Sequence, residues 1–309
     1  MNKLPSVYQI EVFSRCNLKC PFCLTGMANE SPRYETSAMP LHLFRQIVER
    51  DLGNTQFVEL QMRGEPTLHK ELITMINLIK ERDILVVFST HGGTLLKNDR
   101  SFNAALLANY LTISLDAGTK QGYKLKRVGG HWENTINGIS KLIATKGDDP
   151  FPIIDLQLIE EDSGHIPWQN ELRALQQLIY DQHWEGHVHL RTIPNSNVQW
   201  KNPNQPIIAH RELCLNPWLS VSIKANGDVV PCCMAFKDEP EMTYGNVAKQ
   251  SLEEIWDSDF VKAFRFRHTY SASNVDVDLP ETCLNCTNRS PVLYHDTLII
   301  NGLKRQIKG

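Results

Sequence analysis

Near the start of the chain stands the segment Cys16-Asn17-Leu18-Lys19-Cys20-Pro21-Phe22-Cys23, directly after an apolar, strand-like run from Val7 to Val12. Three thiolates at this spacing in one loop can ligate three irons of a cubane cluster and leave the fourth iron without a protein ligand. An iron with an open position indicates chemistry on a bound molecule. A zinc knuckle or a disulfide loop is the alternative, but three cysteines supply too few ligands for a closed tetrahedral zinc site.

The residues up to about position 190 alternate short apolar runs with amphipathic ones. Six strands are predicted at Val7–Val12, Phe57–Met62, Leu85–Ser89, Tyr110–Leu115, Ile153–Leu158 and His187–Arg191. Helical spacing of apolar residues predicts five helices at Leu41–Leu52, Glu71–Arg82, Phe102–Ala108, Trp132–Lys146 and Trp168–Gln182. This alternation predicts an α/β protein with a parallel sheet, and periodicity alone leaves open whether the sheet is doubly wound or a barrel.

Composition bounds the class of protein. The chain has 309 residues, enough for a large core and two structural units. Its 32 basic and 35 acidic residues give a net charge of −3, so we expect no general attraction to nucleic acid or to an anionic membrane. It has no apolar run of about 18 residues and no signal-peptide core at its start, so we expect a cytoplasmic protein. Eight cysteines in tight clusters fit metal ligation in a reducing compartment better than a disulfide framework.

The pattern CxxxCxxC, with the aromatic Phe22 before its last cysteine, resembles the signature of the radical SAM superfamily. The resemblance implies a partial (β/α)6 barrel whose first strand leads into a [4Fe–4S] cluster loop, with Cys16, Cys20 and Cys23 as ligands. In that family the open iron binds S-adenosylmethionine (SAM), and the reduced cluster cleaves it to a 5′-deoxyadenosyl radical that abstracts a substrate hydrogen. The resemblance also implies an external electron donor such as flavodoxin or ferredoxin.

A segment after the second predicted strand, Arg63-Gly64-Glu65-Pro66, is similar to the GGEP motif of that family. The resemblance implies that Gly64 and Glu65 hold the methionine amino group of SAM. A carboxylate can bind an ammonium group, and glycine permits close backbone approach. Arg63 departs from the motif, and we expect it either to meet the substrate or the methionine carboxylate or to be a solvated loop residue.

Two more segments at the carboxyl ends of predicted strands resemble SAM-binding motifs. Thr90 lies in Ser89-Thr90-His91-Gly92-Gly93, which is similar to the family's T-N-G turn with His91 in place of asparagine. Ser114 and Asp116 lie in an S-L-D segment whose polar groups are near the ribose and the methionine carboxylate in the family. The residues from Tyr123 to Arg127 are read as a basic loop that is solvated, with phosphate or carboxylate recognition as the alternative.

The remaining cysteines form a second constellation: Cys214, Cys232, Cys233, Cys283 and Cys286. An alternating run with an Asn-Gly turn, Ser220–Pro231, predicts a β-hairpin that brings Cys214 and Cys232 together. A helix is expected over Leu252–Phe266 before the final CxxC pair.

This half resembles the SPASM and twitch auxiliary-cluster extensions of radical SAM enzymes. Cys286 is followed by no further cysteine, so the resemblance implies one auxiliary [4Fe–4S] cluster, held by Cys214, Cys232, Cys283 and Cys286. A structural zinc site built from the same four thiolates is the alternative. We therefore expect a radical SAM core over residues 1–193, a linker over 194–211 and a small α+β auxiliary-cluster domain over 212–309.

Cys233 is left over from this ligand set. It is either a packed apolar thiol, an alternative ligand or a hydrogen-atom donor to a substrate radical, and an inert buried cysteine is the default. The donor role is the one that would make the enzyme an epimerase.

The resemblance implies a radical SAM oxidoreductase that acts on a hydroxylated small molecule of the sugar or aminocyclitol type, with dehydrogenation as the expected outcome. Epimerisation with a cysteine hydrogen donor and modification of a ribosomally made peptide are the alternatives. A different class of protein also fits a closed four-thiolate site: a non-catalytic iron–sulfur or zinc protein. The open three-thiolate site distinguishes the enzyme from that class.

Overall fold

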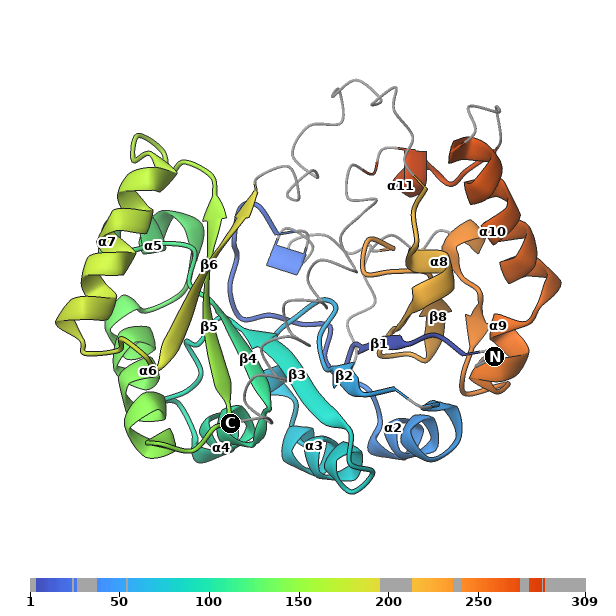
Figure 1. The fold of residues 1–309 in the computed structure, drawn as a ribbon, viewed down its shortest axis with the longest axis horizontal. Helices are drawn as coiled ribbons and strands as arrows, with labels where there is room; N and C mark the ends of the chain where they lie inside the picture. The colour runs from blue at the N-terminus through green and yellow to red at the C-terminus, as the bar shows by residue number, and fades with distance from the viewer. Residues whose placement is uncertain are drawn as a thin grey trace.

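The computed structural model describes residues 4–23, 25–26, 38–53, 55–194, 213–235, 240–272, 278–284 and 286. Six strands with helices between them form the first part of the chain (Figure 1). The strands are β1 (Val7–Ile10), β2 (Phe57–Glu59), β3 (Leu85–Thr90), β4 (Tyr110–Ser114), β5 (Ile153–Glu160) and β6 (Val188–Pro194). All six predicted strands are present, and each pairs in parallel with the next one along the chain.

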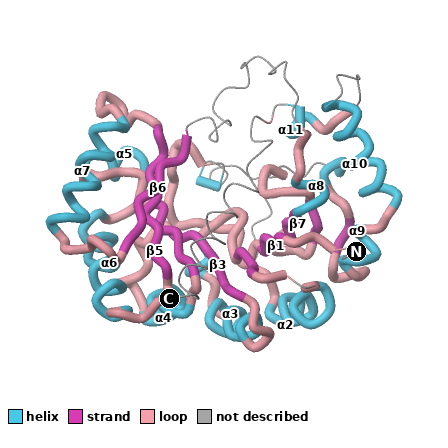
Figure 2. The backbone as a smooth tube through the Cα atoms, in the orientation of Figure 1, coloured by secondary structure: helices cyan, strands magenta, loops and turns pink. Residues whose placement is uncertain are grey.

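The helices of this part lie along the outer side of the curved sheet (Figures 1 and 2). They are α2 (Leu41–Gln46), α3 (Leu72–Lys80), α4 (Asp99–Leu107), α5 (Lys120–Lys126), α6 (Trp132–Lys146) and α7 (Trp168–Asp181). A π-helical turn, η1 (Ile47–Asp51), continues α2, and a 3-10 turn, η2 (Pro66–Leu68), follows β2. Within the described ranges, no helix is both long and apolar enough to cross a membrane.

The expected basic loop from Tyr123 to Arg127 is wrong, because most of it is helix α5. The side chain of Thr119 caps this helix by accepting a hydrogen bond from Gly122 N at 3.0 Å. Tyr123 and Arg127 are buried rather than solvated. A short helix that contains a glycine and many charges has no clear apolar period, so its pattern resembles that of a loop.

The C-terminal part extends the same sheet. Its elements are α8 (Asn216–Leu219), β7 (Ser220–Ile223), β8 (Asp228–Val230), η5 (Pro240–Met242), β9 (Gly245–Asn246), α9 (Leu252–Trp256), α10 (Asp259–Ala272) and α11 (Glu281–Leu284). The predicted hairpin is β7 and β8, and β7 also pairs in parallel with β1 from Val7↔Ser220 to Ile10↔Ile223. One sheet of nine strands, in the order β6-β5-β4-β3-β2-β1-β7-β8-β9, therefore joins both parts.

The single helix expected over Leu252–Phe266 is wrong, because the structure has two helices there. Ser251 caps α9 in a reciprocal arrangement with Glu254, and α9 ends at Trp256. Ser258 then begins the next helix, because its hydroxyl accepts from Val261 N at 3.3 Å. Two N-terminal caps seven residues apart (258 − 251) start two helices. Of the expected linker, residues 195–211 lie outside the described residues.

Buried apolar side chains form a separate cluster on each face of the sheet. Large buried side chains such as Tyr8, Ile10 and Phe88 belong to the main apolar cluster, which includes residues of the outer helices. On the opposite face, Val7, Phe57, Val87, Tyr110 and Ile153 form a smaller apolar cluster. Because side chains alternate along a strand, the residues two positions further along each strand share this inner face. The inner face is therefore closed by an apolar floor, with polar residues above it.

Candidate active site

The loop after β1 brings Cys16, Cys20 and Cys23 into one place. None of the three is in a disulfide, and they share a small apolar cluster with Leu18, Phe22 and Ile159. Cys23 N donates to Cys20 O at 3.1 Å, and Lys19 N donates to Val128 O at 2.9 Å. The three predicted cluster ligands thus lie in a loop that is shaped by its own backbone and by the segment after α5.

The charges around these thiols fit a metal cluster. Burial raises the pKa of the Cys16 thiol to about 12, with further contributions from Glu65, Cys20 and Cys23. Burial also raises the pKa of Cys20, while the Arg127 guanidinium opposes that rise. In the described part of the chain, no three His, Cys, Asp or Glu residues are arranged to hold a single metal ion. Iron would supply the positive charge that makes a set of buried thiolates favourable.

Gly64 packs tightly against the cluster loop. It has a φ of +72°, and a Cβ on it would lie 2.1 Å from the carbonyl oxygen of Phe13. The next residue, Glu65, donates its backbone N–H to Arg15 O at 2.8 Å. Only glycine permits this conformation together with this close approach. The GEP segment and the cysteine loop are therefore one packed unit.

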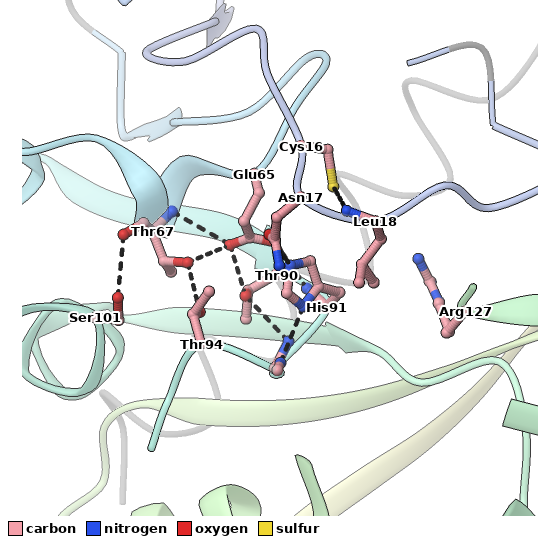
Figure 3. A network of polar contacts seen from close by, with 12 residues as sticks. Cys16, Asn17, Leu18, Glu65, Thr67, Thr90, His91, Thr94, Ser101 and Arg127 are labelled. Carbon is pink, nitrogen blue, oxygen red and sulfur yellow. Dashed lines mark hydrogen bonds and ion pairs between the residues drawn. The ribbon is translucent and has the colours of Figure 1, made fainter. Parts of the chain in front are cut away.

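The Glu65 carboxylate is the centre of a buried network (Figure 3). Its Oε1 accepts from Thr67 N at 3.2 Å, from Thr67 Oγ1 at 2.6 Å and from Thr90 Oγ1 at 2.7 Å. Its Oε2 accepts from His91 N at 3.0 Å. Two residues predicted as SAM contacts, Glu65 and Thr90, thus bond to each other. Their direct contact with the cofactor stays a prediction.

His91, which stands where the family motif has asparagine, ties the turn after β3 to the cluster loop. Its Nδ1 accepts from Gly93 N at 2.9 Å, so its Nε2 carries the proton and donates to Asn17 Oδ1 at 3.0 Å. Burial lowers the pKa of His91, although Glu65 opposes this effect. The histidine therefore serves as a neutral hydrogen-bonding residue.

Asp116 and Arg127 form a buried ion pair beside Cys20. Asp116 Oδ2 accepts from Arg127 Nη2, and Asp116 Oδ1 accepts from Ile159 N at 3.1 Å. Arg127 Nη1 lies 3.6 Å from Cys20 Sγ, and the guanidinium stands 5.5 Å from the centre of the Phe22 ring. Arg127 Nε is buried without an acceptor among the residues that the structure describes. A donor in that position fits an anionic group such as the methionine carboxylate of SAM.

Arg127 was expected to be solvated, with phosphate or carboxylate recognition as the alternative, and its burial makes the solvated interpretation wrong. Its neighbours Lys120, Lys124 and Lys126 are also basic, so the sequence does not single out the one cation that is paired with Asp116. The solvated alternative for Arg63 is also wrong. Its Nε donates to Glu11 Oε1 at 2.6 Å, and Glu11 Oε2 also accepts from Ala225 N at 3.1 Å. Arg63 thus helps to join the core to the β7–β8 hairpin.

Polar side chains cover the inner face of the sheet above the apolar floor. On one side, Arg191 Nε donates to Asp155 Oδ2 at 2.7 Å, and Arg191 Nη2 lies 3.3 Å from Gln157 Oε1. Gln157 reaches Ser114 Oγ at 3.4 Å, so the predicted site residue Ser114 belongs to this group. On the other side, Glu59 Oε2 accepts from Gln9 Nε2 at 2.7 Å and from Gln61 Nε2 at 3.4 Å. This face offers both donors and acceptors to a polar ligand.

The C-terminal cysteines also come together. Burial raises the pKa of the Cys232 thiol well above its usual value, and Cys233, Cys214, Cys283 and Cys286 add to the rise. Cys232 is therefore the thiol on which the other four C-terminal cysteines act electrostatically. That Cys214, Cys232, Cys283 and Cys286 together hold one cluster stays a prediction.

Comparison with known families fits this geometry. The model of the radical SAM superfamily matches residues 10–153. The chain belongs to that superfamily. An iron–sulfur cluster-binding domain, SPASM, matches residues 214–287. The cofactors of this radical SAM enzyme therefore include SAM, a [4Fe–4S] cluster and auxiliary iron–sulfur clusters, as expected from the motifs.

Relatives match nearly the whole chain at low identity. A tungsten-containing aldehyde ferredoxin oxidoreductase cofactor-modifying protein from Pyrococcus furiosus is 23% identical, covering 89% of this chain and 87% of its own. An S-adenosyl-L-methionine-dependent 2-deoxy-scyllo-inosamine dehydrogenase from Niallia circulans is 23% identical over 94% of this chain and 96% of its own. The crystal structure of BtrN with AdoMet and 2-DOIA covers 94% of this chain and 95% of its own, with 18% identity and a TM-score of 0.55. The predicted fold class is thereby confirmed.

Proposed function

We propose that this radical SAM enzyme dehydrogenates a secondary hydroxyl group of a small polyhydroxylated molecule, such as a sugar or an aminocyclitol. The observation that carries the proposal is the C-terminal set of cysteines within the SPASM match, in which Cys214, Cys232, Cys283 and Cys286 would supply four ligands for an auxiliary [4Fe–4S] cluster. Dehydrogenation needs an electron acceptor as well as a hydrogen-abstracting radical, and such a cluster is one. The full-length similarity to a 2-deoxy-scyllo-inosamine dehydrogenase supports the same reaction.

In this proposal, Cys16, Cys20 and Cys23 hold the cluster that binds SAM. Phe22, Gly64, Glu65, Thr90, Ser114 and Asp116 surround the SAM site, and Arg127 Nε supplies a donor to an anionic group of SAM. When bound, SAM and the two clusters would supply a hydrogen-abstracting radical and an electron acceptor. Oxidation of the alcohol to a ketone would remove one hydrogen atom, one electron and one proton, which would pass to that radical, that acceptor and water. The electron that starts each turnover comes from an external donor such as flavodoxin or ferredoxin.

The polar inner face supports a hydroxylated substrate. Ser114, Gln157 and Arg191 are half-buried on one side, and Gln9 and Gln61 are half-buried on the other. Amide and hydroxyl groups can both donate to and accept from a sugar hydroxyl. Below them, Val7, Phe57 and Tyr110 belong to an apolar floor that excludes water. Such a surface holds a small polyol in place while one of its carbon atoms faces the radical.

The proposal is tested with anaerobically reconstituted protein, SAM, a reductant and 2-deoxy-scyllo-inosamine as the first substrate probe. We expect a ketone two hydrogens lighter than the substrate, with one 5′-deoxyadenosine formed for each ketone. Cys20→Ala should abolish formation of 5′-deoxyadenosine. Cys283→Ala should retain it while ketone formation fails. Ketone formation by a Cys283→Ala protein that holds no auxiliary iron would contradict the proposed electron acceptor.

One observation favours epimerisation as a second candidate. Cys233 is half-buried beside Cys232, so a spare thiol lies at the edge of the auxiliary site. In an epimerase this thiol would deliver a hydrogen atom to the carbon radical from the opposite face. In deuterium oxide an exchangeable thiol would place deuterium on the substrate carbon. Deuterium incorporation that disappears in Cys233→Ala would establish epimerisation, whereas a dehydrogenase gives unlabelled ketone with either protein.

A further inference from the structure

The hydroxyl group of Tyr244 is buried without a hydrogen-bond acceptor in the part of the chain that the structure describes. The residue is 5% exposed. Its ring meets the edges or faces of Trp256, Phe260 and Phe264, with centroid distances of 6.5, 6.2 and 5.2 Å. Rings on several sides therefore fix the place of the hydroxyl. A buried tyrosine hydroxyl normally has a partner, and because the described residues supply none, a group bound at this place is a candidate acceptor.

Backbone and sulfur contacts place Tyr244 near two of the auxiliary cysteines. Tyr244 N donates to Val229 O at 2.7 Å, which places Tyr244 beside the strand that leads to Cys232. Met242, two residues earlier, has its sulfur 3.7 Å from Cys283 Sγ. Burial raises the pKa of Tyr244 well above its usual value, and Cys232, Cys283 and Cys214 also contribute to the rise. Tyr244 thus lies beside the segments that carry Cys232 and Cys283, two of the four expected cluster ligands.

A second buried donor lies in the same neighbourhood. Arg265 is held by hydrogen bonds from Nε to Pro217 O at 2.8 Å and from Nη1 to Trp256 O at 3.2 Å. Its Nη2 is buried and has no acceptor among the described residues. Arg265 also acts on Tyr244 directly, because its positive charge opposes the rise in the tyrosine pKa. Two buried donors in one neighbourhood, both without an acceptor among the described residues, fit an anionic, sulfur-rich group.

We infer that the Tyr244 hydroxyl donates a hydrogen bond to a sulfur atom of the auxiliary cluster and raises the reduction potential of that cluster. The inference rests on the proposed function, which places the cluster at these cysteines. Reduction adds negative charge to a cluster, and a donor to its sulfur atoms stabilises the reduced form more than the oxidised form. Tyr244 is therefore a positioning residue that makes the cluster a better acceptor for the electron of the substrate radical.

The experiment is a redox titration of the auxiliary cluster, followed by electron paramagnetic resonance. Full-length protein in which Cys16, Cys20 and Cys23 are all replaced by Ala leaves the auxiliary cluster as the only signal. Tyr244→Phe removes the hydroxyl and keeps the packed ring. We expect the equilibrium constant for reduction of the cluster to fall tenfold in Tyr244→Phe. For a one-electron couple this is a reduction potential about 59 mV lower. Tyr270→Phe is the matched control, because Tyr270 is 42% exposed on α10 and should leave the potential unchanged.

A measurement on the unaltered tyrosine keeps the inference testable even where Tyr244→Phe folds poorly. After exchange into deuterium oxide, pulsed resonance of the reduced cluster should show a deuteron coupled through the tyrosine hydroxyl. The inference is overturned where the cluster is present and neither the potential nor the deuteron signal depends on Tyr244. A chain that binds zinc and no second cluster would overturn the proposed function together with this inference.

Discussion

Replacing Glu65 separates its role in the fold from its role in binding SAM. The carboxylate accepts four hydrogen bonds, two from hydroxyls and two from the backbone N–H groups of Thr67 and His91. In Glu65→Ala the hydroxyls can find other partners, since Thr67 Oγ1 already lies 2.6 Å from Thr94 Oγ1. The two backbone donors stay buried, at about 1–3 kcal/mol each, so we expect a loss of about 2–6 kcal/mol.

Glu65→Gln should be milder for stability. Its amide oxygen can replace Oε1, which accepts three of the four bonds, so only His91 N faces the amide NH2 group. We expect a loss of about 1–3 kcal/mol from that one mismatch. If Glu65 faces the SAM ammonium as we propose, both variants lack that negative charge, so SAM affinity should fall about 10-fold or more in both.

Urea unfolding and equilibrium binding of SAM to reconstituted protein measure these two effects. Glu71→Ala is the matched control, because Glu71 is exposed nearby and its side chain makes no capping bond to α3. Equal stability of the Ala and Gln variants would refute the reasoning from the four donors. Unchanged SAM affinity in the folded Gln variant would show that the carboxylate serves the fold alone.

Asp116, Gly64 and His69 give further predictions. Asp116→Asn should cost about 3–5 kcal/mol because it leaves Arg127 buried without its counter-charge, and adding Arg127→Met should restore part of that loss in urea unfolding. Gly64→Ala should displace the cluster loop and reduce bound iron, whereas Gly186→Ala, also at positive φ but in open space, should cost only about 1–3 kcal/mol of backbone strain. His69 should make the fold less stable in acid. Burial lowers its pKa below the unfolded value of 6.5, so the unfolded chain binds the proton more readily and stability falls as the pH drops below about 6.5.

The His69 effect is checked by comparing unfolding at pH 7.5 and at pH 5.5. His69 Nδ1 accepts from Glu71 N at 3.0 Å, so a proton on that nitrogen would face a backbone N–H. His69→Gln should lose less stability between the two pH values than the unaltered protein does. An equal loss in both proteins would place the acid sensitivity elsewhere.

The local sequence patterns predicted the core strands well, because the sheet buries apolar side chains on both of its faces. Val7 to Val12 and Ile153 to Leu158 are mostly buried, and apolar residues dominate both runs, as is typical of a parallel strand covered on both faces, although polar residues alternate with them on one face. The cysteine loop was equally predictable, because its ligands are close in sequence. Helix α5 was missed because its stability depends on a distant residue. The buried carboxylate of Glu171 accepts from Gly118 N at 2.7 Å and Thr119 N at 2.9 Å, just before the helix begins.

The same limit applies to the candidate site. Glu65 and Thr90 were found one by one, but their bond to each other joins residues 25 positions apart. Arg127 was read as solvated because nothing local shows that its partner Asp116 is fully buried. The orphan hydroxyl of Tyr244 depends on three aromatic rings from helices α9 and α10. Such features arise from tertiary packing, and sequence spacing carries no information on them.

The pairing of β1 with β7 bears on how the two cysteine sets are held relative to each other. A linker between separate domains would let their distance vary, and electron transfer depends strongly on distance. Here β7 extends the core sheet, Arg50 Nη2 donates to Val247 O at 2.7 Å, and the buried Asp51 accepts from Leu252 N at 2.9 Å. Since β1 leads into the cluster loop and β7 leads into the hairpin before Cys232, one ladder of backbone hydrogen bonds fixes both cysteine sets. The proposed electron acceptor is thus held by the same sheet that holds the site of radical formation.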